Sequence, residues 1–289
     1  MKPAPFDYVA PATIDEACAA LAEAGGGAAV LAGGQTLIPL LNLRMSQPFI
    51  IVDINKIADL KGITRAPGCT RVGPMTRQCE VIASDALARD LPVLVEAVRH
   101  VGHHQTRNRG TVGGSIALGE PAAELPATAV ALGATIEVRS VRGTRDIPAG
   151  ELYLGPYMTA LEADELVTRI TFPDWPPGHL PLFREVARRP GDFALVGMVG
   201  ALSVEGGRIA RAGLAWFGMG PTPIRAKAAE QMLLGQSLDG VNPEAVAARA
   251  IADTAPFDDH HASAEYRRTV GARVFARTLR ETLQIREVA

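Results

Sequence analysis

The chain has 289 residues, of which 47% are hydrophobic and 21% are charged, and its formal net charge at pH 7 is −2. A chain of this length and composition is expected to form two or three compact units with buried cores. Because the net charge is close to zero and aromatic residues make up only 5%, the sequence argues against a nucleic-acid or anionic-membrane surface.

The N-terminal segment contains prolines and an aspartate, and no uninterrupted apolar region of the kind found in a signal peptide. No apolar run reaches the roughly 18 residues that a membrane span needs. Cys18, Cys69 and Cys79 are widely spaced and form no CxxC motif, which suits a reducing cytoplasm. Since an iron–sulfur cluster usually takes four thiolates, we expect any metal redox centre to lie in another chain.

The first part of the chain is predicted to alternate strands and helices. Residues 13–16 (TIDE) form a capping box that opens a helix through Ala24. A short strand over 28–31 is followed by a Gly-Gly turn and a helix that contains Leu37, and residues 50–53 form a buried strand. This βαβ order predicts a first unit of about residues 1–55.

A second unit is predicted over about residues 56–177. Its expected strands lie around Ile63, 71–73, 135–138 and 165–172. Its expected helices begin at Thr76, Ser84 and Pro121, where proline suits the first helical position. A basic, polar loop is expected over residues 102–110.

Residues 175–178 (WPPG) are the best linker candidate, so the C-terminal domain is predicted over 178–289. Three strands near 183–186, 194–204 and 209–217 predict an antiparallel meander, with the turn at 205–207 joining the last two. Three helices are expected to follow. They begin near Arg225, Pro243 and Ala264, and the last one is predicted to run through Ile285.

Two Gly-Gly loops carry the strongest chemical signal, Ala32-Gly33-Gly34-Gln35-Thr36 and Thr111-Val112-Gly113-Gly114-Ser115. Glycine lets the backbone approach a phosphate closely and turn successive amides toward one anion. Each loop lies before a predicted helix, and we expect the second loop to repeat the chemistry of the first. A single Gly-Gly is usually only a turn, but two such loops could hold one dinucleotide from both sides.

Other phosphate-binding and catalytic motifs are absent from the sequence. No G-x-G-x-x-G opens a Rossmann unit, and there is no G-x-x-x-x-G-K-[ST]. Residues 113–117 (GGSIA) are not a G-x-S-x-G nucleophile elbow. The adjacent pairs His103-His104 and His260-His261 lack a carboxylate or cysteine at zinc spacing, so we expect no metal site, and His103-His104 is expected to shape a loop.

Four segments follow one another along the chain: residues 31–39 (LAGGQTLIP), 105–117 (QTRNRGTVGGSIA), 121–126 (PAAELP) and 188–194 (RRPGDFA). In this order they resemble the FAD-binding medium subunit of molybdenum hydroxylases, the family of aerobic carbon monoxide dehydrogenase and xanthine dehydrogenase. The resemblance runs over essentially the whole chain. It implies an α+β fold of the vanillyl-alcohol-oxidase (PCMH) type, with two α/β FAD-binding subdomains and a C-terminal domain that has a three-stranded antiparallel sheet and helices.

The resemblance also implies which residues bind FAD. The two loops would hold the pyrophosphate and ribityl chain, and the segments around Val101, Leu166 and Phe193 would lie near the flavin or adenine. The implied cofactor-binding residues are Leu31, Ala32, Gly33, Gly34, Gln35, Thr36, Leu37, Val101, Gly102, Thr111, Gly114, Ser115, Glu124, Leu166, Val167, Arg184, Asp192 and Phe193.

Three positions depart from the family's pattern. Glu124 stands where the family usually has an Asp that binds the polar chain of FAD, and Ser115 replaces a common Asn. Arg184 matches a basic residue near the flavin, although Glu185 stands where some relatives carry a lysine, which leaves the register open.

The resemblance implies an oxidoreductase subunit in which no residue of this chain acts on the organic substrate. A large subunit with a molybdopterin cofactor would oxidise the substrate, and a small subunit with two [2Fe-2S] clusters would pass electrons to the FAD of this chain. The acceptor would be NAD, a quinone or oxygen, and two such heterotrimers would form a heterohexamer. The alternatives are a stand-alone flavin oxidase of the same fold and an assembly subunit without a cofactor.

Overall fold

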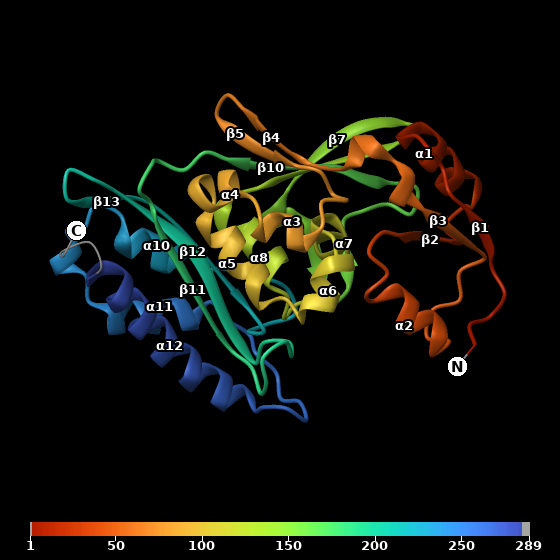
Figure 1. Cartoon of the computed structure of the whole chain (residues 1–289). Helices are drawn as coiled ribbons and strands as arrows, with labels where there is room; N and C mark the ends of the chain where they lie inside the picture. Colours follow the sequence, from red (N-terminus) through yellow and green to blue (C-terminus); the bar gives the residue numbers. More distant parts are fainter. Residues whose placement is uncertain (1, 285–289) are drawn as a thin grey trace.

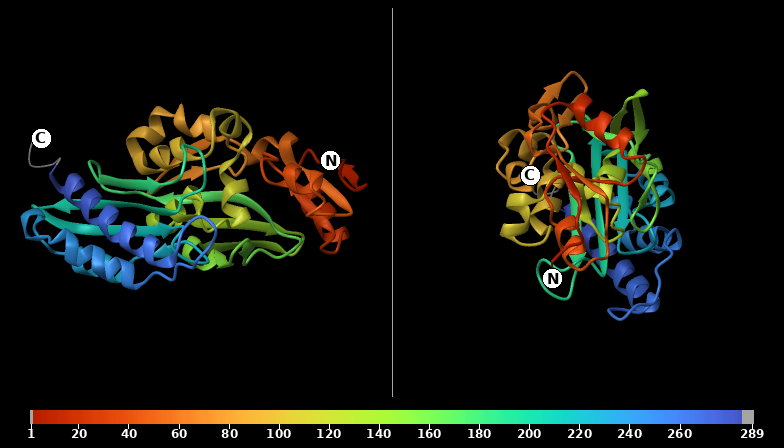
Figure 2. Two further views of the ribbon diagram at one scale, coloured as in Figure 1. Left: turned by 90° about the horizontal axis from the view of Figure 1, so that it is seen from below. Right: turned by 90° about the vertical axis from the view of Figure 1, so that its right-hand side faces the viewer.

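The computed structural model describes residues 2–284. Three units lie in a row, each built on its own β-sheet (Figures 1 and 2). We call them the N-terminal unit, around the β1–β3 sheet; the central unit, around the five-stranded sheet; and the C-terminal unit, around the β11–β14 sheet. None of the helices within residues 2–284 combines the length and apolarity needed to cross a bilayer.

The N-terminal unit is a parallel sheet in the order β1-β3-β2 with two helices. Its elements are β1 (Asp7–Val9), α1 (Ile14–Glu23), β2 (Ala28–Leu31), α2 (Leu37–Asn42) and β3 (Ile50–Asp53). The predicted start of α1 is confirmed, because the amide of Glu16 donates to Thr13 Oγ1 at 3.2 Å. The predicted turn after β2 leads directly into α2.

The central unit is a five-stranded sheet in the order β4-β5-β10-β6-β7, with helices packed against it. Its strands are β4 (Ile63–Ala66), β5 (Cys69–Val72), β6 (Thr135–Ser140), β7 (Gly143–Pro148) and β10 (Leu166–Pro173). Its α-helices are α3 (Gln78–Ile82), α4 (Asp85–Asp90), α5 (Pro92–His100), α6 (His104–Arg109), α7 (Val112–Leu118), α8 (Glu124–Leu132) and α9 (Ala149–Leu152). Two short strands complete it, β8 (Tyr153–Gly155) and β9 (Met158–Thr159). The short helices η1 (Ile54–Lys56) and η2 (Ala58–Leu60) belong to the N-terminal unit, whose core contains Ile54, Ile57 and Leu60.

The C-terminal unit is an antiparallel sheet covered on both faces. Its strands are β11 (Leu180–Val186), β12 (Val196–Glu205), β13 (Arg208–Phe217) and β14 (Ile224–Arg225), and its helices are α10 (Lys227–Leu233), η3 (Leu238–Gly240), α11 (Pro243–Ala252) and α12 (Ala264–Gln284). One face packs on α8 of the central unit, and the other packs on α10, α11 and α12 (Figure 1). The central and C-terminal units therefore share a core through β12 and β13.

Four sequence predictions differ from the structure. The C-terminal sheet has four strands rather than three, because the two residues of β14 pair with Ala215 and Trp216. The helix expected from Pro121 begins at Glu124, since the Glu120 carboxylate accepts the amide of Ala122 at 3.0 Å and holds a turn there. The helix expected from Thr76 begins two residues later, and the loop expected over 102–110 contains α6. The predicted end at Ile285 lies outside the described residues.

Candidate functional site

A cavity of about 720 Å³ lies where the N-terminal unit meets the central unit. Every predicted cofactor-binding residue except Leu31 and Arg184 lines it. These lining residues come from distant parts of the chain: the β2–α2 loop, the segments before α6 and α7, the start of α8, the start of β10 and the 187–193 loop. The fold thus brings together residues that the sequence separates by more than 100 positions.

The first glycine loop presents free backbone donors. Within residues 2–284, the amides of Gly33, Gly34, Gln35 and Thr36 have no hydrogen-bond acceptor in the chain. Gly34 has a φ of +73°, a conformation that costs glycine little and other residues more. Successive unpaired amides in such a turn suit an anion. This loop therefore offers a row of donors of the kind that a phosphate group needs.

The second glycine loop differs from the prediction that it repeats this chemistry, because the amides from Val112 to Ser115 already have partners. The amide of Gly113 donates to Pro74 O at 2.8 Å, and the amide of Gly114 donates to Thr111 Oγ1 at 3.1 Å. A Cβ on Gly113 would lie 2.3 Å from Pro74 Cβ, so this glycine is required for packing. What the loop offers to a ligand is therefore side-chain hydroxyl groups, on Thr111 and Ser115.

One end of the cavity is closed by two loops that contact each other. Val101 and Gly102 follow α5, and Gly102 has a φ of +48°. A Cβ on Gly191 would lie 2.5 Å from the Cε1 atom of His103, so the 187–193 loop packs directly on the residue that precedes α6. Phe193, at the end of that loop, also lines the cavity. Of the histidine pair expected to shape a loop here, His103 lines this wall, whereas His104 is the first residue of α6 and does not line it.

Glu124 lines the cavity although it is only 3% exposed. Burial raises the pKa of Glu124 to about 8, and the carboxyls of Glu185 and Glu120 add to the rise. The side chain is therefore mostly protonated at neutral pH. A protonated carboxyl can donate as well as accept a hydrogen bond, which widens the role expected from the sequence.

Sequence reasoning missed several lining residues. Gln78 is buried, and its Oε1 atom has no hydrogen-bond partner among the described residues. Gln78 belongs to no recognisable sequence motif, and only the fold brings it beside Gly110. The other lining residues that were missed and that carry polar side chains are Thr106, Glu120 and Glu165.

The two predicted residues outside the cavity have other contacts. Arg184 on β11 points toward α12, where its Nη2 atom donates to Glu281 Oε2 at 2.6 Å. Leu31 lies beneath the first loop, because its Cδ1 atom would be 3.3 Å from a Cβ on Gly34. Glu185 on the same strand as Arg184 is half-buried, and burial raises its pKa to about 7.

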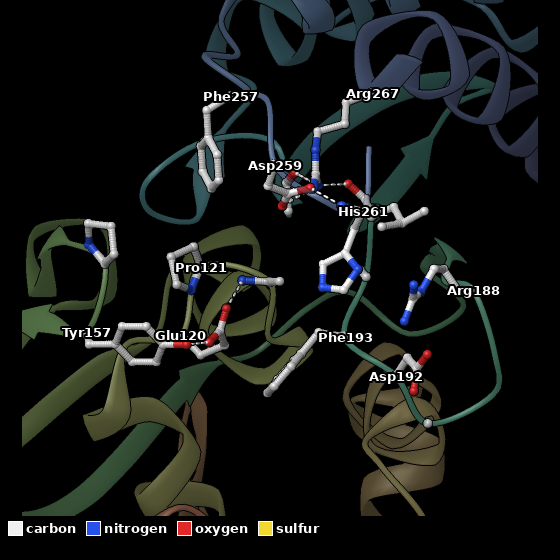
Figure 3. Close-up of a pocket in the computed structure, with 17 residues that line it drawn as sticks. Glu120, Pro121, Tyr157, Arg188, Asp192, Phe193, Phe257, Asp259, His261 and Arg267 are labelled. Carbon is white, nitrogen blue, oxygen red and sulfur yellow. Dashed lines mark hydrogen bonds and ion pairs between the residues drawn. The ribbon is translucent and has the colours of Figure 1, made fainter. Parts of the chain in front are cut away.

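A second cavity, of about 540 Å³, adjoins the first and opens between the central and C-terminal units (Figure 3). The two cavities share Glu120, Gly191, Asp192 and Phe193 as lining residues. The hydroxyl group of Tyr157 donates to Glu120 Oε2, which holds this carboxylate at the shared wall. Phe257, on the opposite side, belongs to the loop between α11 and α12.

Comparison with known proteins identifies the family. Residues 4–175 match the family described as the FAD binding domain in molybdopterin dehydrogenase, and residues 182–282 match the CO dehydrogenase flavoprotein C-terminal domain. The chain belongs to this flavoprotein family. The 6-hydroxypseudooxynicotine dehydrogenase complex subunit alpha of Paenarthrobacter nicotinovorans is 37% identical over 98% of this chain and 96% of its own length. Caffeine dehydrogenase subunit beta of Pseudomonas sp. (strain CBB1) is 38% identical over 96% of this chain and 95% of its own length.

Solved structures of flavoprotein family members confirm the fold. A chain of carbon monoxide dehydrogenase from Hydrogenophaga pseudoflava superposes with a TM-score of 0.94 at 35% identity, over 99% of both chains. A chain of quinoline 2-oxidoreductase from Pseudomonas putida 86 superposes with a TM-score of 0.91 at 33% identity, over 98% of this chain and 99% of that one. The predicted PCMH-type fold, FAD-binding domain and oxidoreductase class are thereby confirmed. The boundaries near residues 55 and 177 and the individual site residues stay predictions.

Proposed function

We propose that this chain binds one non-covalent FAD in the 720 Å³ cavity and transfers electrons from a small [2Fe-2S] subunit to an external acceptor. The observation that carries the proposal is the row of unpaired amides at Gly33–Thr36 in a family of FAD-binding domains. Bound FAD would supply the redox chemistry, and the protein would supply position, shielding and electrostatics.

The residues present fit FAD on three independent counts. The first loop offers free amides to the pyrophosphate, and Thr111 and Ser115 offer hydroxyl groups on the facing wall. The buried Oε1 atom of Gln78, which accepts no hydrogen bond from the described part of the chain, needs a donor that a polar ligand can supply. Protonated Glu124 can exchange hydrogen bonds with the hydroxyl-rich chain of the cofactor.

The relatives' names place proteins of this family in multi-subunit dehydrogenases. By analogy, this chain would join a large molybdopterin subunit and a small [2Fe-2S] subunit, and two such heterotrimers would form a heterohexamer. Cys18, Cys69 and Cys79 are free thiols, which suits a cytoplasmic complex. None of the three lines the cavity, so the chain would hold the flavin without a thiol contact.

The second cavity is the proposed binding site of the electron acceptor. Three exposed aromatic side chains line it, Tyr157, Phe193 and Phe257, at 62%, 60% and 52% exposure. Such rings can stack on a planar acceptor. Phe193 also lines the 720 Å³ cavity proposed for FAD, which we call the flavin cavity. Both cavities would thus share the wall across which electrons move.

The charges of the second cavity favour a neutral acceptor, such as a quinone, over the dianionic pyrophosphate of NAD. Three carboxylates line it, those of Glu120, Asp192 and Asp259, against the guanidinium groups of Arg188 and Arg267. Arg267 is already bound to Asp259 at 2.7 Å. No surplus of positive charge is left for a pyrophosphate.

The subunit role is tested by co-expression with the genes for a large and a small subunit. The three chains should copurify, and anaerobic addition of the organic substrate should bleach the flavin absorbance. A chain that carries FAD but binds neither partner would instead be a stand-alone flavin protein. A chain that joins both partners without flavin would be an assembly subunit.

The acceptor site is tested on the FAD-loaded chain after chemical reduction without oxygen. A water-soluble naphthoquinone should reoxidise the flavin faster than NAD does, and Phe257→Ala should slow the quinone reaction. Phe49→Ala removes an 80%-exposed ring of the N-terminal unit that does not line this cavity, and it serves as the matched control. Faster reoxidation by NAD, or a quinone rate unaffected by Phe257→Ala, would contradict this assignment.

A further inference from the structure

A pair of side chains links the backbones of the two glycine loops. Asn55, just after β3, donates from Nδ2 to the carbonyl oxygen of Ala32 at 2.9 Å. Arg77, just before α3, donates from Nη2 to Asn55 Oδ1 at 2.6 Å and from Nη1 to the carbonyl oxygen of Arg109. Ala32 precedes Gly33 in the first loop, and Arg109 precedes Gly110 before the second loop. The pair thus ties the N-terminal unit to the central unit beside the cavity.

Neighbouring groups fix the orientation of both side chains. Asp53 Oδ1 accepts from Asn55 Nδ2 at 2.6 Å and from its amide at 2.9 Å, so Oδ1 of Asn55 faces Arg77. Tyr8 holds the other carboxylate oxygen of Asp53 at 2.6 Å. Glu80 Oε2 accepts the amide of Arg77 at 2.6 Å. The link is therefore one chain of hydrogen bonds that starts on β1 and ends at Arg109.

Asn55 and Arg77 act at a distance from any ligand, because neither lines the flavin cavity. Both are half-buried between the two units, and burial, followed by the nearby Arg109, lowers the pKa of Arg77. Their link ends where the first loop contacts the chain just before the second, since a Cβ on Gly33 would lie 2.4 Å from Arg109 O. The link is therefore placed to set the distance between the free amides of the first loop and the hydroxyl groups of the second.

The two units are also joined at a second place, away from the loops. Cys18 Sγ on α1 donates to Arg139 O of β6 at 3.4 Å, and Asp15 lies 2.5 Å from the Arg139 guanidinium. Met75 and Leu166 of the central unit pack into the core of the N-terminal unit. Loss of the Asn55–Arg77 link should therefore leave the two units folded and docked.

We propose that Asn55 and Arg77 are positioning residues that hold the two glycine loops at the spacing that FAD requires. The inference rests on the proposed function, because it needs FAD in this cavity. A pre-set spacing lowers the ordering cost of binding, so the link should appear in cofactor affinity rather than in the stability of the empty protein.

The test compares FAD binding by the full-length chain and by Arg77→Met, which removes both donors but keeps the length of the side chain. FAD affinity should fall about tenfold or more, as expected for loss of charge-assisted hydrogen bonds. Arg71→Met removes an exposed charge from β5 of the same unit, and its affinity should change by less than about twofold. An equal loss in both variants would mean that general positive charge, rather than the link, attracts FAD, and would overturn the proposal.

Two further measurements separate positioning from simple destabilisation. In Arg77→Met the Tm of the empty chain should stay near that of the parent, while the rise in Tm on saturation with FAD should shrink. Asn55→Ala should behave in the same way, and adding it to Arg77→Met should cause less loss than the two single effects combined. If the parent protein and the Arg77→Met and Asn55→Ala variants all bind FAD equally well, only the inference about the positioning residues is overturned. If the parent protein binds no FAD, the proposed function itself is overturned.

Discussion

Gly33 lies directly against the carbonyl oxygen of Arg109, so that a Cβ at position 33 would be 2.4 Å from that oxygen. The contact joins the two loops predicted to hold one cofactor. The glycines of the two loops are required for different reasons. Gly33 and Gly113 are required by packing against other backbone or proline atoms, whereas Gly34 is required by its positive φ.

Replacing Gly33 with Ala should push the two loops apart, because the obstructing atoms belong to the backbone and cannot rotate away. We expect a loss of about 1–3 kcal/mol in the free energy of unfolding. We also expect FAD affinity to fall by more than tenfold (~1.4 kcal/mol). Urea unfolding and fluorescence titration with FAD measure the two effects. The control is Gly150→Ala, since a Cβ there meets no atom within 4 Å and the helix α9 should tolerate it.

Replacing Gly34 or Gly114 with Val should expel FAD while the fold persists. At Gly34 the φ of +73° is unfavourable for a β-branched residue, and at Gly114 a Cβ would lie 2.8 Å from Thr111 Oγ1. Flavin content and far-UV circular dichroism give the readout. Purified variants with normal flavin content would show that the loops are turns without a role in binding.

Replacing Glu124 with Gln should change how stability depends on pH. The pKa of this carboxyl is raised from about 4.5 to about 8 in the folded chain, so the folded state holds a proton that the unfolded state releases between these values. The free energy of unfolding of the empty chain should therefore fall as pH rises across this interval. The Gln variant should be more stable at pH 8 by about 1–4 kcal/mol, with a flatter profile. The Gln variant should still lose some stability as pH rises, because the pKa of Glu185 is also raised. Parallel profiles for parent and variant from urea unfolding at pH 5 and pH 8 would count against a protonated Glu124.

Replacing Gln78 with Leu should have opposite effects on the empty and the loaded chain. The Oε1 atom is buried and has no hydrogen-bond partner within residues 2–284, a situation that costs about 1–3 kcal/mol, so its removal should raise the Tm of the empty protein. The same change removes a proposed contact with the cofactor and should weaken FAD binding. A lower Tm of the empty chain would show that the amide has a structural partner, such as a water molecule.

Much of the fold follows from local signals. The Thr13 cap of α1, the glycine turn after β2 and the 205–207 hairpin all lie where the sequence predicts them. The second half of the predicted capping box differs, because the Glu16 carboxylate accepts the amide of Ala12 at 2.7 Å rather than that of Thr13. The predicted start of α8 at Pro121 was wrong because Glu120 stabilises a turn through a side-chain hydrogen bond. The preference of proline for the first helical position does not capture this bond. The helix α6 was missed because its six residues are polar and include no buried side chain, so no apolar period marks it.

The candidate site was predictable only where it lies on motifs. The two loops and the 188–194 segment carry recognisable patterns, and the structure places them on one cavity. Gln78, Asn55 and Arg77 carry no pattern, because their roles arise from contacts between units that are distant in the sequence. The unequal chemistry of the loops was also hidden, since the partners of the Gly113 and Gly114 amides appear only once Pro74 and Thr111 are in place.

The central claim is that this chain holds one FAD, and flavin content measures it directly. The chain, purified with its partner subunits, should carry one FAD per copy that denaturation releases intact, since binding is non-covalent. A preparation whose partners have their full complement of molybdopterin and [2Fe-2S] clusters, but in which this chain shows no flavin absorbance, would contradict the account.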